Sequence, residues 1–157
     1  MKFIVMFFVV VAAGFCGGCS KSETGEPSAK AAAHHEHQPP HGGAPVELGR
    51  EEYHVEFVLD SAGGQLQAFV LDGEMENFIR IAAPSLEVTA NVGGREKKLL
   101  LLPVANHATG ETVGDTSMFE ANADWLKSTP AFDAILKQIT IRSTTYTNIA
   151  FNYPKGG

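Results

Sequence analysis

Short runs of alternating apolar and polar residues fill the chain from residue 53 onward. In the clearest run, Leu86–Val92, every second residue is apolar and the residues between are polar. Successive side chains of a strand point to opposite faces of a sheet, so this pattern predicts a strand with one buried face. The pair Gly93 and Gly94 that follows is typical of a two-residue hairpin turn, because glycine tolerates positive φ angles.

Similar runs predict an antiparallel domain of about eight short strands. The strands that can be delimited are Tyr53–Leu59, Gln65–Leu71, Phe78–Ile81, Leu86–Val92, Lys97–Val104, Ile139–Arg142 and Ile149–Tyr153. The uninterrupted apolar stretch Leu99–Leu102 predicts that its strand is buried on both faces. The expected fold class is mainly β, as an antiparallel β-sandwich or an open barrel with a short helical insert.

Two short helices are predicted to interrupt the strands. Asn122 can cap a helix over Ala123–Lys127, and the pair Thr129-Pro130 is a typical start for a second helix over Ala131–Lys137. The aromatic and apolar residues around Trp125 are interpreted as core that packs these helices against the sheet. A ligand groove in the same place is the alternative.

The first eighteen residues are organised like an export signal. Their uncharged apolar run, Phe3–Phe15, is too short to span a membrane. The sequence C-G-G-C that ends at Cys19 resembles the lipobox of bacterial lipoproteins, although Cys16 stands where the family has an aliphatic residue. The resemblance implies removal of residues 1–18 and attachment of more than one acyl chain at Cys19. A plain secretory signal and an uncleaved anchor are the alternatives.

The segment after Cys19 is predicted to be a tether. Between Ser20 and Gly43 it contains no Val, Ile, Leu, Met or aromatic residue, so folding cannot bury enough apolar surface to offset the lost conformational entropy. The expected organisation is a signal peptide over 1–18, a disordered His-rich tether over 19–44 and a β-sandwich domain over 45–157. The lipid would hold the chain to a bacterial membrane on its periplasmic or extracellular face, with the outer membrane favoured in a Gram-negative cell.

Charge and motifs exclude several classes of function. The formal net charge is −6, whereas binding to nucleic acid requires a basic surface. Removal of the signal peptide leaves Cys19 as the one cysteine, so an internal disulfide cannot form. The chain contains no nucleophile elbow, phosphate-binding loop or dinucleotide-binding turn. Asp72, Glu74 and Glu76 lack the spacing of a calcium loop and predict a solvated turn. We therefore expect a protein that is not an enzyme.

A histidine-rich segment is the main candidate for chemistry. Neutral imidazole is a ligand for Zn, Cu and Ni ions, and several imidazoles on a flexible chain can converge on one ion. Such a site releases its metal as the pH falls, because ligating imidazoles must be neutral. The alternative is a linker whose histidines are only compositional. The candidate ligands are His34, His35, His37 and His41, four of the six histidines.

A second candidate lies on the first predicted strand. Glu52, His54 and Glu56 have a spacing of two and share one face, where they can form a row of metal ligands. A charged face exposed to solvent is the interpretation that we favour. His107 has only Glu111 nearby in the sequence and is interpreted as a surface histidine.

The chain from His41 onward resembles small β-rich domains of exported bacterial proteins. The segments that carry this resemblance are HGGAPVELGREEYHVEFVLD, AFVLDGE, DWLK and the terminal FNYP. The opening H-G-G followed by a strand is also similar to domains found near heavy-metal efflux adaptors. We expect a non-enzymatic lipoprotein that binds metal ions through its tether, beside an envelope protein such as a metal-efflux component. The alternative is a protein–protein interaction module of the cell envelope with no metal role.

Overall fold

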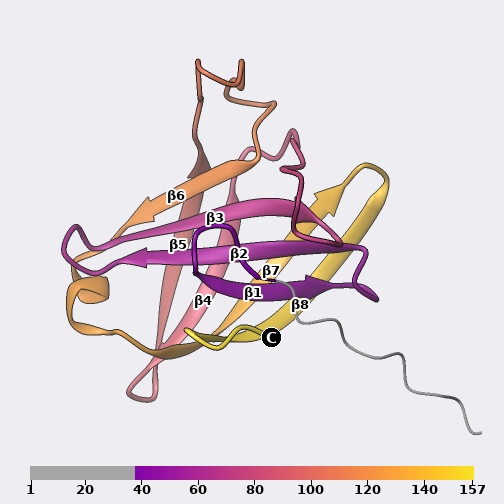
Figure 1. Cartoon of the computed structure of the whole chain (residues 1–157). Coiled ribbons are helices and arrows are strands. Elements are labelled where there is room, and N and C mark those ends of the chain that lie inside the picture. Colours follow the sequence, from indigo (N-terminus) through magenta and orange to yellow (C-terminus); the bar gives the residue numbers. More distant parts are fainter. Residues whose placement is uncertain (1–37) are drawn as a thin grey trace, which may run out of the picture. The chain divides into compact units, whose positions relative to one another are not determined.

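The computed structural model describes residues 38–157 (Figure 1). The predicted signal peptide and Cys19 lie outside the described residues, as do three predicted metal ligands, His34, His35 and His37. The fourth predicted ligand, His41, lies within them. No helix of the described part is long and apolar enough to cross a membrane.

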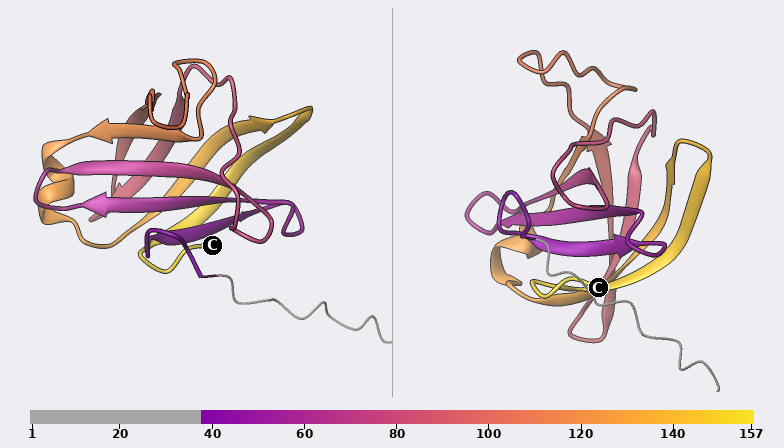
Figure 2. Two further views of the ribbon diagram at one scale, coloured as in Figure 1. Left: turned by 45° about the horizontal axis from the view of Figure 1, so that its top comes forward. Right: turned by 45° about the vertical axis from the view of Figure 1, so that its right-hand side comes forward.

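One antiparallel sheet forms the fold, and its strands follow the order β1-β2-β3-β6-β5-β4-β7-β8. Figure 2 shows β1, β2 and β3 running across β7 and β8, so that the sheet curls round a common interior. The predicted fold class, mainly β with an open barrel as one of its two forms, is confirmed. The strands are β1 (Ala44–Leu48), β2 (Tyr53–Asp60), β3 (Gln65–Asp72), β4 (Leu86–Val92), β5 (Arg95–Pro103), β6 (Met118–Asn122), β7 (Phe132–Ile141) and β8 (Thr144–Tyr153).

The end of the chain joins the two outer strands of the sheet. The backbone N–H of Gly157 donates to the carbonyl oxygen of Pro45 at 3.1 Å, and the N–H of Glu47 donates to the carbonyl of Gly157 at 3.4 Å. Gly156 has a φ of 95°, and a Cβ atom there would collide with the backbone of Pro45. Glycine is therefore needed for the tail to lie against β1, and the sheet becomes nearly closed and barrel-like.

The interior is filled by alternate residues of the strands. On β4 the buried residues are Leu86, Val88 and Ala90, as the alternating pattern predicts. Phe57 on β2 stacks on Phe151 on β8, with ring centroids 4.4 Å apart and planes within 3° of each other. This aromatic pair connects strands from opposite ends of the sheet order, so the core is shared by the whole sheet.

Strand β5 differs from its prediction. Leu99 and Leu101 are buried, whereas Leu100 and Leu102 are 56% and 54% exposed. The expectation of a strand buried on both faces is therefore wrong. Leucine occupies both faces of β5, so its alternation cannot be seen in the sequence. Nothing in residues 38–157 covers the outer face of this strand.

The predicted second helix, Ala131–Lys137, is also wrong, because this segment begins β7. Buried residues alternate along the first half of β7 up to Leu136, and then the phase shifts so that Ile139 and Ile141 are buried. The prediction rested on the pair Thr129-Pro130 as a typical helix start, and here that pair precedes a strand in which Phe132, Ala134 and Leu136 are buried.

The first predicted helix is a short 3-10 helix, η1 (Asp124–Ser128), and Asn122 does not cap it but ends β6. Trp125 packs edge to face on Phe132, with centroids 5.7 Å apart. Phe132 is buried in the core and the half-buried Trp125 packs against it, so the expected core packing is found for η1 but not for the second predicted helix.

Three short segments were assigned wrongly from the sequence. Phe78–Ile81 contributes isolated bridges to Leu71 and Thr116 and is not a strand. Strands β1 and β6 were not predicted. Each contains only five residues, and β1 begins at Ala44, which the predicted boundary places in the tether.

Candidate functional site

The candidate site lies on the outer face of β2, β3 and β6. Glu56 on β2 is paired in register with Phe69 on β3, and Phe69 is paired with Met118 on β6. The chain neighbours of these residues, such as Phe57 and Phe119, point into the core. Glu56, Phe69 and Met118 therefore form a line across three strands, which we call the outer row.

The segment before β1 folds back over this row. The backbone N–H groups of His41 and Gly43 donate to Glu56 Oε1 at 2.9 and 2.8 Å, and His41 Nδ1 lies 2.8 Å from Glu56 Oε2. Gly43 has no room for a side chain, because a Cβ atom would press on the backbone of Phe57. His41 and Gly43, which the predicted boundary places in the tether, therefore belong to the folded domain.

Glu56 has no exposed surface, so its carboxylate depends on these donors. A buried charge is strongly unfavourable unless it is hydrogen-bonded and paired. Two backbone N–H groups and one imidazole supply that compensation. These donors are separated from Glu56 in the sequence, His41 by fifteen residues and Gly43 by thirteen.

The His41 ring lies flat on Phe69. Their ring centroids are 3.9 Å apart and their planes differ by 20°. Phe78 stands beside the pair, 5.7 Å from His41 and 6.2 Å from Phe69 between centroids. Because a carboxylate accepts hydrogen bonds, His41 Nδ1 carries the hydrogen, and a neutral ring keeps its lone pair on Nε2.

A cavity of about 340 Å³ opens beside the imidazole. His41, Phe69, Phe78 and Met118 are among the residues that line it. The His41 side chain is 37% exposed, so the ring is held in place but remains accessible from this cavity.

Glu111 also lines the cavity. Its carboxylate accepts hydrogen bonds from the N–H and Oγ of Ser117, at 2.9 and 2.6 Å, and from Thr109 Oγ1 at 2.8 Å. Burial raises the pKa of Glu111, but these hydrogen bonds and the nearby Arg80 outweigh it and hold the pKa below its usual value. The carboxylate is therefore a structural group that fixes the loop before β6.

Arg80 lines the same cavity and is matched by acidic groups. Its Nε lies 3.8 Å from Glu111 Oε1 and its Nη1 lies 3.5 Å from Asp115 Oδ2. Its Nη2 donates to the carbonyl of Thr109. The positive charge of Arg80 is thus surrounded by acceptors.

The second predicted site is not formed. His54 and Glu56 are 6% and 0% exposed, so the expected solvated face of β2 is wrong for both. His54 Nδ1 lies 3.4 Å from the carbonyl of Asp72, and Glu56 contacts His41. Glu52 accepts a hydrogen bond from the hydroxyl group of Tyr146. Burial and the Glu52 carboxylate raise the pKa of Tyr146 to about 12. The three side chains therefore have separate partners.

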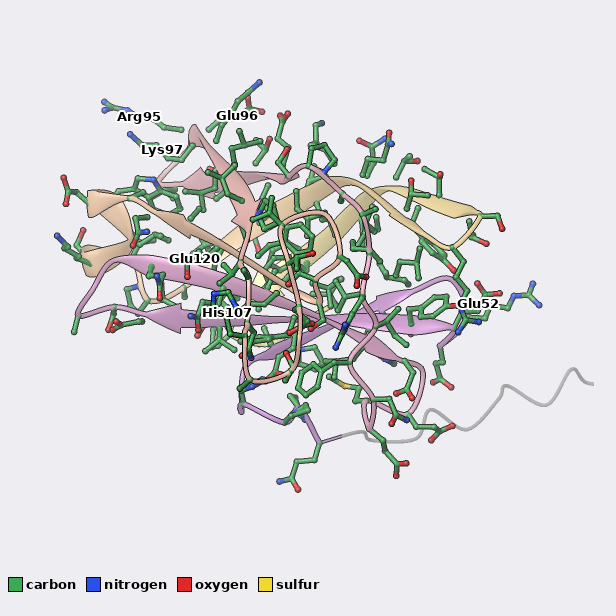
Figure 3. All side chains as sticks on the ribbon, turned by 90° about the horizontal axis from the view of Figure 1, so that it is seen from above. Glu52, Arg95, Glu96, Lys97, His107 and Glu120 are labelled. Atoms are coloured by element: carbon green, nitrogen blue, oxygen red, sulfur yellow. The ribbon has the colours of Figure 1, made fainter. Side chains whose placement is uncertain are left out.

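The predicted solvated turn and surface histidine are confirmed. Glu74 and Glu76 are exposed, and Asp72 accepts hydrogen bonds from the N–H of Glu76 and from Asn77. Burial raises the pKa of Asp72, but these hydrogen bonds prevail and lower it. His107 lies exposed in the loop between β5 and β6, and Figure 3 shows it well away from Glu52.

The described residues contain no group of three or more His, Cys, Asp or Glu side chains placed to hold a metal ion. Of the predicted ligands, the structure therefore places only His41, beside Glu56. Sequence analysis singled out Glu56 only as part of a ligand row with Glu52 and His54, and it did not single out Phe69 or Met118. Their outward positions follow from strand alternation, but the segment that covers them does not.

The His41–Glu56 contact can be tested with Glu56→Gln. Glutamine keeps an oxygen for the two backbone N–H groups, but it removes the charge that faces Nδ1. We expect the free energy of unfolding to fall by about 1–3 kcal/mol, because a charge-assisted hydrogen bond in a buried place is lost. In NMR spectra the ring protons of His41 should lose the shift caused by stacking on Phe69.

Glu120→Gln is the matched control, because Glu120 lies on the outer face of β6 and contacts Gln65 instead of His41. It should leave the His41 ring signals unchanged. Unchanged signals in Glu56→Gln as well would contradict the contact.

Searches for similar proteins add no name to this site. No family model, curated protein or solved structure matches the chain. Its function must therefore be argued from its own residues.

Proposed function

We propose that the protein is a membrane-anchored, non-enzymatic exported lipoprotein that binds a transition-metal ion, Cu, Zn or Ni. The signal peptide 1–18 is removed, Cys19 carries the lipid, and the ligands are His34, His35, His37 and His41. The observation that supports this most is the hydrogen bond between His41 Nδ1 and the buried carboxylate of Glu56.

Histidines that bind metals commonly donate their second ring N–H to a carboxylate. That hydrogen bond fixes the tautomer, orients the ring and makes the free nitrogen more basic. Glu56 stands in this relation to His41, whose other nitrogen is left for a ligand. If the His41–Glu56 pair only stabilised the fold, the imidazole would not need to stay accessible. The His41 side chain is 37% exposed, which supports a role in binding a ligand.

The other three histidines precede His41 closely in the sequence. A predicted flexible segment attached to a fixed ligand keeps its imidazoles near that ligand, which raises their effective concentration. The resulting site is exchangeable, and it suits an accessory role in metal handling or efflux beside an envelope protein. The lipid places it on the periplasmic or extracellular face of the membrane, with the outer membrane favoured in a Gram-negative cell.

Metal titration of residues 20–157 with Cu, Zn and Ni tests the site. Replacing His34, His35 and His37 with alanine should weaken binding by at least about tenfold, and His41→Ala should do so as well, since changes around a metal ion typically have effects of this size. His107→Ala is the control and should bind like the original chain. Equal binding by all variants, or none below about millimolar, contradicts the proposal. If metal binding is lost only in variants of Glu52 or His54, the site lies on β2 instead.

The lipid anchor is tested separately by changing Cys19 to serine. The lipid on Cys19 supplies the membrane affinity, and serine lacks the thiol that lipidation requires, so labelled palmitate should no longer be incorporated and the protein should leave the membrane fraction. Cys16→Leu is the matched control, because it restores the usual aliphatic residue of the lipobox and should remain lipidated. Unaltered labelling in Cys19→Ser would refute the anchor.

A second candidate function, the interaction module, is favoured by the outer edge of β5. The register pairs Arg95–Leu101 with β4, whereas β6 meets β5 only at Leu102 and Pro103. Within residues 38–157 no other strand pairs with that edge. Leu100 and Leu102 are exposed there, beside a groove of about 550 Å³. An unpaired edge with apolar side chains can accept an extended strand from a partner.

The basic residues at the tip of the β4–β5 hairpin specify the partner further. Figure 3 shows Arg95 and Lys97 projecting there, with Glu96 between them in sequence. In this second function, the partner bound at the edge of β5 is an extended segment of another envelope protein. This segment is apolar where it meets Leu100 and acidic toward the hairpin tip.

A photo-crosslinking residue at position 100 tests this second function in cells. We expect an adduct with one envelope protein, which Leu100→Lys should weaken by at least about tenfold when the purified pair is measured. The same crosslinker at Val113, an apolar residue that is 70% exposed on a loop, is the control and should give no such adduct. No adduct at position 100, or only an adduct with a second copy of this chain, argues against the module.

A further inference from the structure

We propose that the metal ion is Cu(I) and that the thioether of Met118 is a second fixed ligand beside His41 Nε2. The inference rests on the proposed function for the metal-binding role of His41, and it goes further by naming a ligand and an oxidation state. It starts from the order of the outer row.

The outer row places Met118 and Glu56 on opposite sides of Phe69. The strands lie in the order β2, β3, β6, and the register puts Phe69 directly between the other two residues. Neighbouring strands are about 4.8 Å apart. A ring stacked on Phe69 is therefore within reach of both side chains.

The orientation of His41 follows from its two contacts. The ring lies on Phe69, and its Nδ1 is turned toward Glu56. The two nitrogens of an imidazole point in strongly divergent directions, so Nε2 is turned away from β2 and toward β6. His41 and Met118 line the same cavity, in agreement with this orientation.

Met118 is placed to offer its sulfur to that cavity. Its chain neighbour Phe119 is fully buried in the core, so strand alternation sends the Met118 side chain outward. It is half-buried, which limits its freedom without removing it from the cavity.

The chemistry of this pair selects Cu(I). A thioether is a soft, uncharged ligand that suits Cu(I) and binds Zn²⁺ or Ni²⁺ poorly. Imidazole suits copper as well. The rings of Phe69 and Phe78 lie beside the imidazole, and such apolar neighbours disfavour a strongly hydrated dication. Aromatic faces also attract a bound cation.

The charges around the cavity favour a cation. Glu56 contacts His41, Glu111 lines the cavity, and Asp115 contacts Arg80 from outside the cavity lining. Arg80 is the one positive group among the described residues that line the cavity, and its guanidinium contacts both Glu111 and Asp115. Three carboxylates against one guanidinium leave the surroundings negative.

Met118→Leu tests the inference, since leucine keeps the volume and removes the sulfur. Residues 20–157 are titrated anaerobically with Cu(I) against a coloured Cu(I) chelator, and separately with Zn²⁺. We expect the Cu(I) affinity to fall by at least about tenfold and the Zn²⁺ affinity to change by less than about twofold, because only the soft ion uses the sulfur. X-ray absorption should show a copper–sulfur contact in the original chain and none in the variant.

Met75→Leu is the matched control, because Met75 is buried in the loop after β3 and does not line the cavity. Its Cu(I) affinity should equal that of the original chain. If Met118→Leu binds Cu(I) as tightly as the original chain while His41→Ala does not, the role of Met118 is refuted and the proposed function stands. If the original chain binds none of the Cu, Zn and Ni ions, both fail.

Discussion

A carboxylate with no exposed surface governs the outer face of this sheet. Glu56 lies on the side of β2 that points away from the core, where a carboxylate is ordinarily hydrated. Removing that water is unfavourable by several kcal/mol unless donors replace it. The donors are His41 and Gly43, so burial of Glu56 and the fold-back of the segment before β1 require each other. The orientation of the His41 ring is a consequence of that requirement.

The sheet is closed between β1 and β8 but left partly open between β5 and β6. Between β1 and β8 the tail supplies the missing backbone partners, and Gly156 allows the close approach. Between β5 and β6 only two residue pairs are in register, because the strands diverge beyond them. An edge of this kind is normally protected by charged side chains. Arg95, Lys97 and Lys98 give β5 some of that protection, whereas Leu100 and Leu102 do not.

Local pattern predicted the parts of the fold that depend on neighbours in sequence. Leu86–Val92 and the glycine turn after it are set by alternation and by positive φ angles of 59° and 79° at Gly93 and Gly94, which adjoining residues determine. β7 was mistaken for a helix because Thr129-Pro130, a typical helix start, here precedes a strand. The burial of Glu56 was missed because the segment that covers it is not adjacent in sequence. The local pattern around a polar residue on an outer face does not indicate whether another segment covers it. The same reason hid the neighbourhood of Met118, which depends on strand order and not on sequence.

The position of His41 changes what a histidine-rich tether can do in the proposed function. Histidines on an unattached chain lose conformational entropy for every imidazole that binds. Here one imidazole is already ordered, and the folding of the domain supplies that ordering through Glu56 and Phe69. A metal ion that binds this arrangement also stabilises it, because a ligand that binds only the folded form shifts the equilibrium toward that form. Metal binding and attachment of the tether to the sheet are then coupled, and loss of either weakens the other by the same free energy.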